Sequence, residues 1–443
     1  MAIWASIWEA RCTPVIVRLL RAILAQMGHR RIRPFAAASL RHNTAGHDRP
    51  CTGRRPPHQS IGKEFPMTIL KQPIVGTMGA DIVGPRNPQV EAQNPDILIP
   101  PLTDHGGIPN LKFPFAMAHN RLEDGGWARE VTQRELGTLK ELAMVNMRLP
   151  PGVVRELHWH KEAEWAYVLN GRVRFYLVDD QRQTLVEDLG PGDLWLAPAG
   201  FPHAIQGLEE GTEFVLVFND GNFSENQTLL VTELFAHTPR DVLAKNFGVP
   251  VEAFDGIPGH EKYIFRQPVP PPLEDVRKSL GAATFTDRYV FRASQIAATP
   301  FPGGATKVVD SKSFAVTNLA ALFIDLEPGG MREIHWHPDA DEIQYYISGK
   351  TRMTVFDAVA NARTFDFVPG DVGYVPKTLA HYIENIGDEP VRVLNVFHTG
   401  EYKDVSLNNW LALTPRHLVE GHLDVGDPLL SSLRATRQAV VKG

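Results

Sequence analysis

Two groups of histidine and glutamate residues carry the chemistry that this sequence could support. The first group is His158, His160, Glu164 and His203, and the second is His335, His337, Glu342 and His381. The two groups lie 177 residues apart at the first histidine (335 − 158) and 178 apart at the last (381 − 203), which predicts one metal-binding domain present twice. Three imidazoles and one carboxylate, without sulfur, suit a divalent ion such as Mn²⁺ or Fe²⁺.

The spacing within each group is that of a β-strand. Residues i and i+2 of a strand point to the same face, so His158 and His160 can both enter a barrel interior while Trp159 points away. A turn at Pro198-Ala-Gly200 then leads toward the last histidine of the first group. The second copy reads Pro376-Lys-Thr378 and lacks this glycine, so we expect its turn to use another conformation.

Short β-like runs, broken by Gly, Pro and Asp, surround both groups and predict sandwich or barrel domains. The runs are 143–149, 166–169, 173–178, 194–197 and 212–218, with a second series at 320–326, 343–347, 351–356, 373–375 and 391–397. Each series is followed by a Thr-Pro pair, Thr238-Pro239 and Thr414-Pro415, which predicts a helix with Thr as N-cap and Pro as its first residue. The expected fold class is therefore all-β, with two tandem domains and short flanking helices.

The composition along the chain suggests six segments. Residues 1–63 hold eleven Lys/Arg and only two Asp/Glu, so we interpret 1–66 as an extension: translation starting at Met67, or a disordered or cleaved targeting segment. The other segments are an extended N-terminal arm over 67–127, a first domain over 128–248, a Pro-rich linker over 249–285, a second domain over 286–430 and a C-terminal tail over 431–443.

The bulk composition excludes several classes of protein. A formal charge of −6 argues against nucleic-acid binding, and no apolar run approaches the length of a membrane-spanning helix. The two cysteines, Cys12 and Cys51, both precede the repeated domains, so neither domain can use a disulfide or thiolate ligands. We expect a cytoplasmic protein that acts on a small molecule.

The repeated motif, Gly-x5-His-x-His-x3,4-Glu-x6-Gly followed by Gly-x5-Pro-x-Gly-x2-His, resembles that of the cupin superfamily. The segments Arg155-Glu-Leu-His158-Trp-His160-Lys-Glu-Ala-Glu164 and Gly370-Asp-Val-Gly-Tyr-Val-Pro376 are similar to the bicupin oxalate decarboxylases of bacteria and fungi. The resemblance runs from about residue 70 to the C-terminus. It implies two jelly-roll domains, two Mn²⁺ per chain, dioxygen as co-catalyst, conversion of oxalate to formate and CO₂, and a trimeric or hexameric homo-oligomer.

The resemblance also assigns roles to single residues. Arg155 lies where the family's substrate-orienting arginine is found, and Arg332 has the same place in the second copy. The segment Ser224-Glu225-Asn226-Gln227-Thr228 resembles the mobile lid whose glutamate transfers a proton, which makes Glu225 the expected catalytic group. The family's second domain often has a glutamate where this chain has Asn395, so we expect chemistry in the first domain only.

Several alternatives stay open at this point. An oxalate oxidase would release CO₂ and H₂O₂, a non-catalytic storage or binding bicupin would hold essentially no metal, and another Fe- or Mn-dependent cupin could act as a dioxygenase or isomerase. Trp159 and Trp336, one between each histidine pair, could relay electrons between the sites or serve only in packing.

Overall fold

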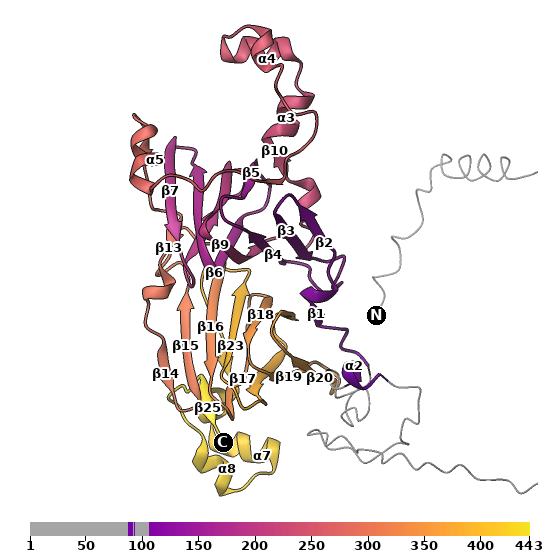
Figure 1. Ribbon diagram of the computed structural model, residues 1–443. Helices are drawn as coiled ribbons and strands as arrows, with labels where there is room; N and C mark the ends of the chain where they lie inside the picture. The colour runs from indigo at the N-terminus through magenta and orange to yellow at the C-terminus, as the bar shows by residue number, and fades with distance from the viewer. Residues whose placement is uncertain (1–86, 92, 94–105) are drawn as a thin grey trace, which may run out of the picture. The chain divides into compact units, whose positions relative to one another are not determined.

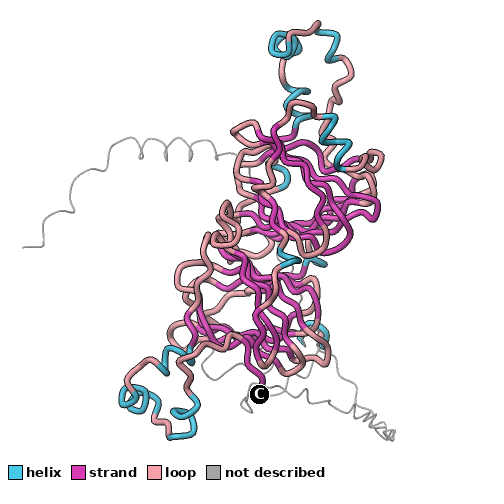
Figure 2. Tube along the Cα trace, turned by 90° about the vertical axis from the view of Figure 1, so that its left-hand side faces the viewer, coloured by secondary structure: helices cyan, strands magenta, loops and turns pink. Residues whose placement is uncertain are grey.

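The computed structural model describes residues 87–91, 93 and 106–443, so the interpretations of residues 1–66 and of most of the arm lie outside the described residues. Two strand-built barrels make up most of the described chain, and the helices are short and lie outside them (Figures 1 and 2). The all-β fold class with two tandem domains is therefore confirmed. Within the described residues, no helix is both long and apolar enough to cross a membrane.

The first barrel is formed by β2 to β13. Their bounds are β2 (Asn120–Glu123), β3 (Gly126–Val131), β4 (Ala143–Leu149), β5 (Val154–Trp159), β6 (Glu164–Val178), β7 (Gln183–Leu189), β8 (Leu194–Ala197), β9 (His203–Phe218), β10 (Leu229–Leu230), β11 (Ile264–Phe265), β12 (Thr284–Phe285) and β13 (Val290–Phe291). The last three strands come from the segment between the domains and pair with β5, β7 and β8 of this barrel.

The second barrel repeats the pattern with β14 to β25. Their bounds are β14 (Thr299–Phe301), β15 (Gly304–Val309), β16 (Ala320–Leu326), β17 (Gly330–Trp336), β18 (Glu342–Ser348), β19 (Thr351–Phe356), β20 (Ala362–Phe367), β21 (Asp371–Val375), β22 (Ala380–Asn385), β23 (Val391–Phe397), β24 (Val405–Ser406) and β25 (Val440–Lys442). The arm contributes β1 (Lys112–Pro114), which pairs with β21 of this second barrel.

The α-helices connect or flank the barrels. They are α2 (Pro88–Glu91), α3 (Val231–His237), α4 (Arg240–Phe247), α5 (Leu273–Ser279), α6 (Leu407–Ala412), α7 (Arg416–Leu423) and α8 (Asp427–Ser432). Helices α4 and α7 occur where the Thr-Pro pairs predict them, but the expected capping is wrong. Pro239 and Pro415 have extended ψ angles of 133° and 127° and are themselves the N-caps. The hydroxyls of Thr238 and Thr414 instead donate to the carbonyls of Leu234 and Trp410 within the preceding helices.

The sequence reads as continuous apolar runs over β6 and β18 because both faces of these strands are buried. Trp165 and Tyr167 belong to a core shared with Ile343 and Tyr345 of the second barrel, whereas the alternating Ala166 belongs to the interior of the first barrel. A strand that is buried on both faces has no side facing solvent, so its sequence lacks the alternating polar residues of a half-exposed strand. The shared core joins the outer faces of the two barrels.

Candidate metal centres

The first centre is assembled by the register of three strands of the first barrel. His158 near the end of β5 pairs directly with His203 at the start of β9, and Glu164 begins β6, the other neighbour of β9. Together with His160, which follows β5, they are at most 3% exposed, and their ligand atoms all lie within 4.8 Å of one another. The four predicted ligands therefore converge on one buried point.

Backbone carbonyls fix which nitrogen each imidazole turns toward that point. The Nδ1 atoms of His158, His160 and His203 lie 2.6, 2.6 and 2.9 Å from the carbonyl oxygens of residues 156, 162 and 201. A carbonyl only accepts, so Nδ1 must carry the proton and Nε2 is left with a lone pair. This arrangement is typical of imidazoles that bind metal ions.

The carboxylate of Glu164 is held for the same task. Its Oε1 accepts a hydrogen bond of 2.8 Å from Trp195 Nε1, and its Oε2 lies 3.3 Å from His160 Nε2 and 3.5 Å from His203 Nε2. Burial alone would raise the pKa of Glu164, but a proton on His203 or His160 outweighs burial and lowers this pKa well below its usual range, so the carboxylate is ionised even when the rings are charged. Burial and the charge of Arg155 lower the pKa of His158, so this imidazole is neutral. An ionised carboxylate facing imidazole lone pairs fits a divalent cation.

The second centre has the same construction. The Nδ1 atoms of His335, His337 and His381 lie 2.7, 2.7 and 3.1 Å from carbonyl oxygens of residues 333, 403 and 379. Gln344 takes the place of the tryptophan and donates to Glu342 Oε1 over 3.1 Å. The Nε2 atoms of His337 and His381, and Oε2 of Glu342, are buried and have no hydrogen-bond partner of normal geometry among the described residues. Lone pairs left facing one another in this way also fit a divalent cation.

One expectation for the second centre is wrong. Thr378 has a φ of +70°, close to the +80° of Gly200, and its N–H donates to the carbonyl of His337 as that of Gly200 does to His160, both over 2.8 Å. The turn therefore keeps its left-handed conformation although a β-branched residue is strained there. The need to place His381 at the centre outweighs the preference of threonine for a negative φ.

Arg155 and Glu225 meet inside the first barrel. Glu225 begins a short 3₁₀ segment, Glu225–Gln227, that is capped by the hydroxyl of Ser224. Arg155 Nη2 donates to Glu225 Oε2 over 3.0 Å, and the hydroxyl of Tyr263 donates to the same oxygen over 2.9 Å. Burial and the charge of Glu225 raise the pKa of Tyr263 well above its usual value, so it remains a donor. No sequence pattern pointed to Tyr263, because it lies in the Pro-rich segment between the domains.

A β-bulge explains how Arg155 reaches the barrel interior. Residues three apart in a regular strand point to opposite faces, yet Arg155 and His158 are 1% and 3% exposed. The pairing of β5 with β9 shifts register between these two residues, and the intervening Leu157 is 55% exposed. The extra residue turns both side chains inward. The same shift occurs between Arg332 and His335 in β17.

The segment 224–228, which the resemblance predicts to be a lid, is attached to strand β3 and to the loop that follows it. The N–H of Glu225 donates to Glu130 Oε2 over 3.1 Å, and Arg134 Nη1 donates to Ser224 Oγ over 3.0 Å. Burial and the charge of Glu225 raise the pKa of Glu130. A cavity of about 120 Å³, lined in part by Arg121, Glu130 and Glu225, lies beside the lid.

The second centre has a different set of neighbours around its arginine. Asn395 is buried in β23, and its Oδ1 has no hydrogen-bond partner among the described residues. Asp404, which the sequence did not point to, contacts Arg332 and accepts a hydrogen bond of 2.7 Å from the hydroxyl of Tyr402. Burial alone would raise the pKa of Asp404, but Arg332 and Arg437 lower it below its usual value, so it is ionised.

Comparisons with known proteins agree with this architecture. A family model described as cupin matches residues 115–253 and 293–428. The chain is 50% identical over 376 residues to the oxalate decarboxylase OxdC of Bacillus subtilis, covering 84% of this chain and 97% of that protein. It is 38% identical to a probable oxalate decarboxylase of Arthroderma benhamiae, covering 82% and 91%. A solved structure of the Bacillus subtilis oxalate decarboxylase superposes with a TM-score of 0.80 over 84% of this chain and 97% of that one, and another concerns its Mn(II) centres.

Proposed function

Because this chain belongs to the bicupin oxalate decarboxylases of the cupin family, we propose that it converts oxalate to formate and CO₂ at its first centre, with Arg155 and Glu225 as the groups that carry the reaction. Hydrogen oxalate gives formate and CO₂ without net oxidation, so the proposed dioxygen co-catalyst is not consumed. The observation that carries the proposal is the buried ion pair between Arg155 and Glu225, with Arg155 near enough to the metal-binding group for its charge to lower the pKa of His158.

Each of the two centres would hold one Mn²⁺ with its four ligands. When bound, Mn²⁺ supplies a Lewis acid and a redox partner for a carboxylate. The ligands are His158, His160, Glu164 and His203 in the first centre, and His335, His337, Glu342 and His381 in the second.

The residues of the first centre perform three tasks. Arg155, which is 1% exposed, presents a fixed guanidinium that would hold one carboxylate of oxalate, while Glu225 swings off its nitrogen. Glu225 takes the acidic proton of hydrogen oxalate and returns it to carbon after CO₂ has left, forming the C–H bond of formate. Tyr263 donates to Glu225 and so positions its carboxylate. The closed lid excludes water and dioxygen from the reacting fragment.

The assay of this proposal follows formate and H₂O₂ together in Mn-loaded protein given oxalate at mildly acidic pH. We expect formate as the main product, and a loss of at least about 100-fold in Glu225→Ala and Glu225→Gln, because neither side chain transfers a proton. Glu209→Ala, an exposed glutamate of the same barrel, should match the wild type. H₂O₂ as main product would identify an oxidase, and no turnover with two Mn per chain would refute oxalate as substrate.

We also infer that the chain forms a homo-oligomer, a trimer or a hexamer. Helices α3, α4, α6 and α7 lie outside the barrels (Figure 2). They expose large apolar side chains, among them Leu234 (48%), Phe247 (54%), Trp410 (55%) and Leu423 (47%). Large apolar side chains exposed on such helices favour association with further copies. Sedimentation equilibrium measures the mass directly, and a monomer at micromolar concentration would contradict the inference. A location in the cytoplasm stays a prediction.

A further inference from the structure

The arginine of each barrel is occupied by a carboxylate of the chain itself. In the first barrel, Glu225 Oε2 accepts from Arg155 and from the hydroxyl of Tyr263. In the second, Asp404 Oδ2 accepts from Arg332 and from the hydroxyl of Tyr402. Each arrangement thus joins a buried guanidinium, a carboxylate oxygen and a phenol.

The two carboxylates do not come from matching backbone positions. Strand β10 places Leu230 opposite His158, and strand β24 places Ser406 opposite His335. Asp404 lies two residues before Ser406, and the residue two before Leu230 is Thr228. Asp404 therefore corresponds to Thr228 and not to Glu225. The position of Asp404 on Arg332 is therefore a feature of the second site and does not follow from the domain repeat.

The loop that carries Asp404 is also fixed more firmly than the lid of the first barrel. The carbonyl of Lys403 accepts from Nδ1 of the metal-binding His337, and Val405 already pairs with β17. Asp404 thus lies between a residue bonded to His337 and a residue paired with Trp336 of β17. Glu225 lies three residues farther from its strand than Asp404 does and has more freedom to move.

A second arginine contacts Asp404. Arg437 lies between α8 and β25, and its Nη2 contacts the same Oδ2 atom that Arg332 contacts. Strand β25 pairs with β17, and the carbonyl of Ala439 accepts from Arg332 Nη1 over 3.2 Å, which holds the C-terminal segment against the site. Glu225, in contrast, has Arg155 as its one arginine partner among the described residues.

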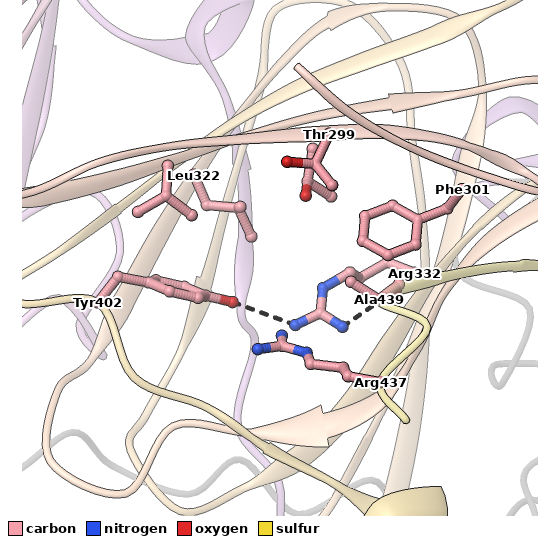
Figure 3. Close-up of a pocket in the computed structure, with 9 residues that line it drawn as sticks. Thr299, Phe301, Leu322, Arg332, Tyr402, Arg437 and Ala439 are labelled. Carbon is pink, nitrogen blue, oxygen red and sulfur yellow. Dashed lines mark hydrogen bonds between the residues drawn. The ribbon is translucent and has the colours of Figure 1, made fainter. Parts of the chain in front are cut away.

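A cavity opens beside these two guanidinium groups (Figure 3). Its volume is about 140 Å³, and Thr299, Thr306 and Tyr402 contribute to its lining together with Arg332 and Arg437. Cavities of this size accept a benzene-sized molecule, so a one- or two-carbon carboxylate fits and a large ligand does not. Paired guanidinium groups bind such carboxylates with defined geometry.

We propose that the second centre contains a two-arginine binding site for a small carboxylate such as formate or oxalate, and that Asp404 occupies this site as an internal ligand. Arg332 and Arg437 bind the Asp404 carboxylate where an external carboxylate would otherwise bind. The inference rests on the proposed function in one respect, since it extends the carboxylate-binding role of Arg155 to Arg332.

The first test measures oxalate binding by calorimetry to Mn-loaded protein in an Arg155→Ala background, which removes the proposed anchor of the first site. Adding Asp404→Ala should create saturable binding of one oxalate per chain, at least about tenfold tighter than in the background, because the competing internal ligand is gone. Adding Arg332→Ala or Arg437→Ala should weaken that binding again. Metal analysis must show that both centres remain loaded.

The second test uses rescue of stability, because Asp404→Ala leaves two arginines without their shared partner. Formate or oxalate should raise the unfolding temperature of Asp404→Ala above that measured in chloride at equal ionic strength, and should not do so when Arg437→Ala is added. A folded, metal-loaded Asp404→Ala protein that neither binds oxalate nor gains stability from these anions would overturn the proposal.

The two tests also separate this inference from the proposed function. A further outcome is that oxalate binding persists in the Arg155→Ala background and is insensitive to Arg332→Ala. That result would show that Arg155 is not the oxalate anchor of the first site. The proposal for Asp404 is then tested by the number of oxalate molecules bound per chain. Asp404→Ala should add a second bound oxalate, and Arg332→Ala should remove it. No added equivalent refutes it.

Discussion

At the scale of single residues, the hydrogen bonds behind the metal ligands distinguish two centres that look identical as ligand sets. Trp195 holds Glu164 in the first centre, whereas Gln344 holds Glu342 in the second. A rigid indole and a flexible amide constrain a carboxylate differently, so the two centres should differ in affinity although they share three imidazoles and one carboxylate.

Trp195→Phe should weaken Mn²⁺ binding at the first centre by about 10- to 100-fold, because Glu164 loses the donor that orients it. Trp165→Phe is the matched control, since Trp165 is also buried but its Nε1 has no hydrogen-bond partner among the described residues. Metal titration of the two variants measures the difference. Equal affinities would show that the Trp195 hydrogen bond does not tune the site.

The buried histidines should make the metal-free protein sensitive to acid. Burial and the neighbouring arginine lower the pKa of His158 and of His335 well below 6.5. The unfolded chain then binds more protons than the folded one below about pH 6.5, so stability falls as the pH decreases, by about 1.4 kcal/mol per unit for each histidine. Denaturant unfolding of chelator-treated protein between pH 7.5 and 5.5 measures this slope, and His158→Gln should reduce it. A flat profile contradicts the prediction.

At the scale of elements, bulges, turns and the lid segment decide which side chains reach the centres. The bulge in β5 brings Arg155 to the side of His158, and the left-handed turn at Gly200 precedes the strand of His203. In the second barrel the left-handed residue is Thr378, which is strained, while Asp404 replaces the lid glutamate as the partner of the arginine.

Thr378→Gly should stabilise the protein by about 1 kcal/mol, because glycine adopts a φ of +70° without the clash of a β-branched side chain. Gly200→Thr in the first barrel is the reciprocal variant and should destabilise by a similar amount. Chemical unfolding of Mn-loaded protein compares both with the wild type. A loss of stability in Thr378→Gly would mean that the threonine side chain contributes more than its backbone strain costs.

The attachment of the lid to β3 should affect the choice of product. Glu130→Ala removes the acceptor for the N–H of Glu225, so the lid should open more often and the ratio of H₂O₂ to formate should rise. Asp255→Ala, which breaks the exposed pair with Arg240, serves as control and should leave the ratio unchanged. An unchanged ratio in Glu130→Ala would show that this hydrogen bond does not keep the lid closed.

At the scale of the whole described molecule, the two barrels are joined by a shared core and by exchanged strands. Strand β1, from the arm that precedes the first barrel, pairs with β21 of the second. Its Lys112 is 7% exposed and reaches Asp371 over 2.8 Å and the carbonyl of Asp366 over 2.6 Å. The arm therefore ties the second barrel to the chain segment before the first.

Lys112→Ala should lower the free energy of unfolding by about 3 kcal/mol or more, because it leaves Asp371 buried without its cation. Lys278→Ala is the control, since its pair with Asp275 is exposed and such pairs contribute about 0–1 kcal/mol. Equilibrium unfolding in urea measures both variants. Equal, small effects would show that the exchanged strand adds little to stability.

The sequence by itself determined the repeat, the all-β class and both clusters of three histidines and one glutamate, because residue spacing and strand periodicity are local patterns along the chain. It also placed helices α4 and α7, although their capping residues were wrong by one position, because proline fixes φ and leaves ψ free.

Only the tertiary structure decided the remaining features. The burial of Arg155 on the same side of β5 as His158 depends on a bulge. Tyr263, Asp404 and Arg437 contact residues that lie 38, 72 and 33 positions away. A strand register shift and long-range contacts leave no periodic signal in a sequence, since they are selected by how two barrels and their connecting segments pack.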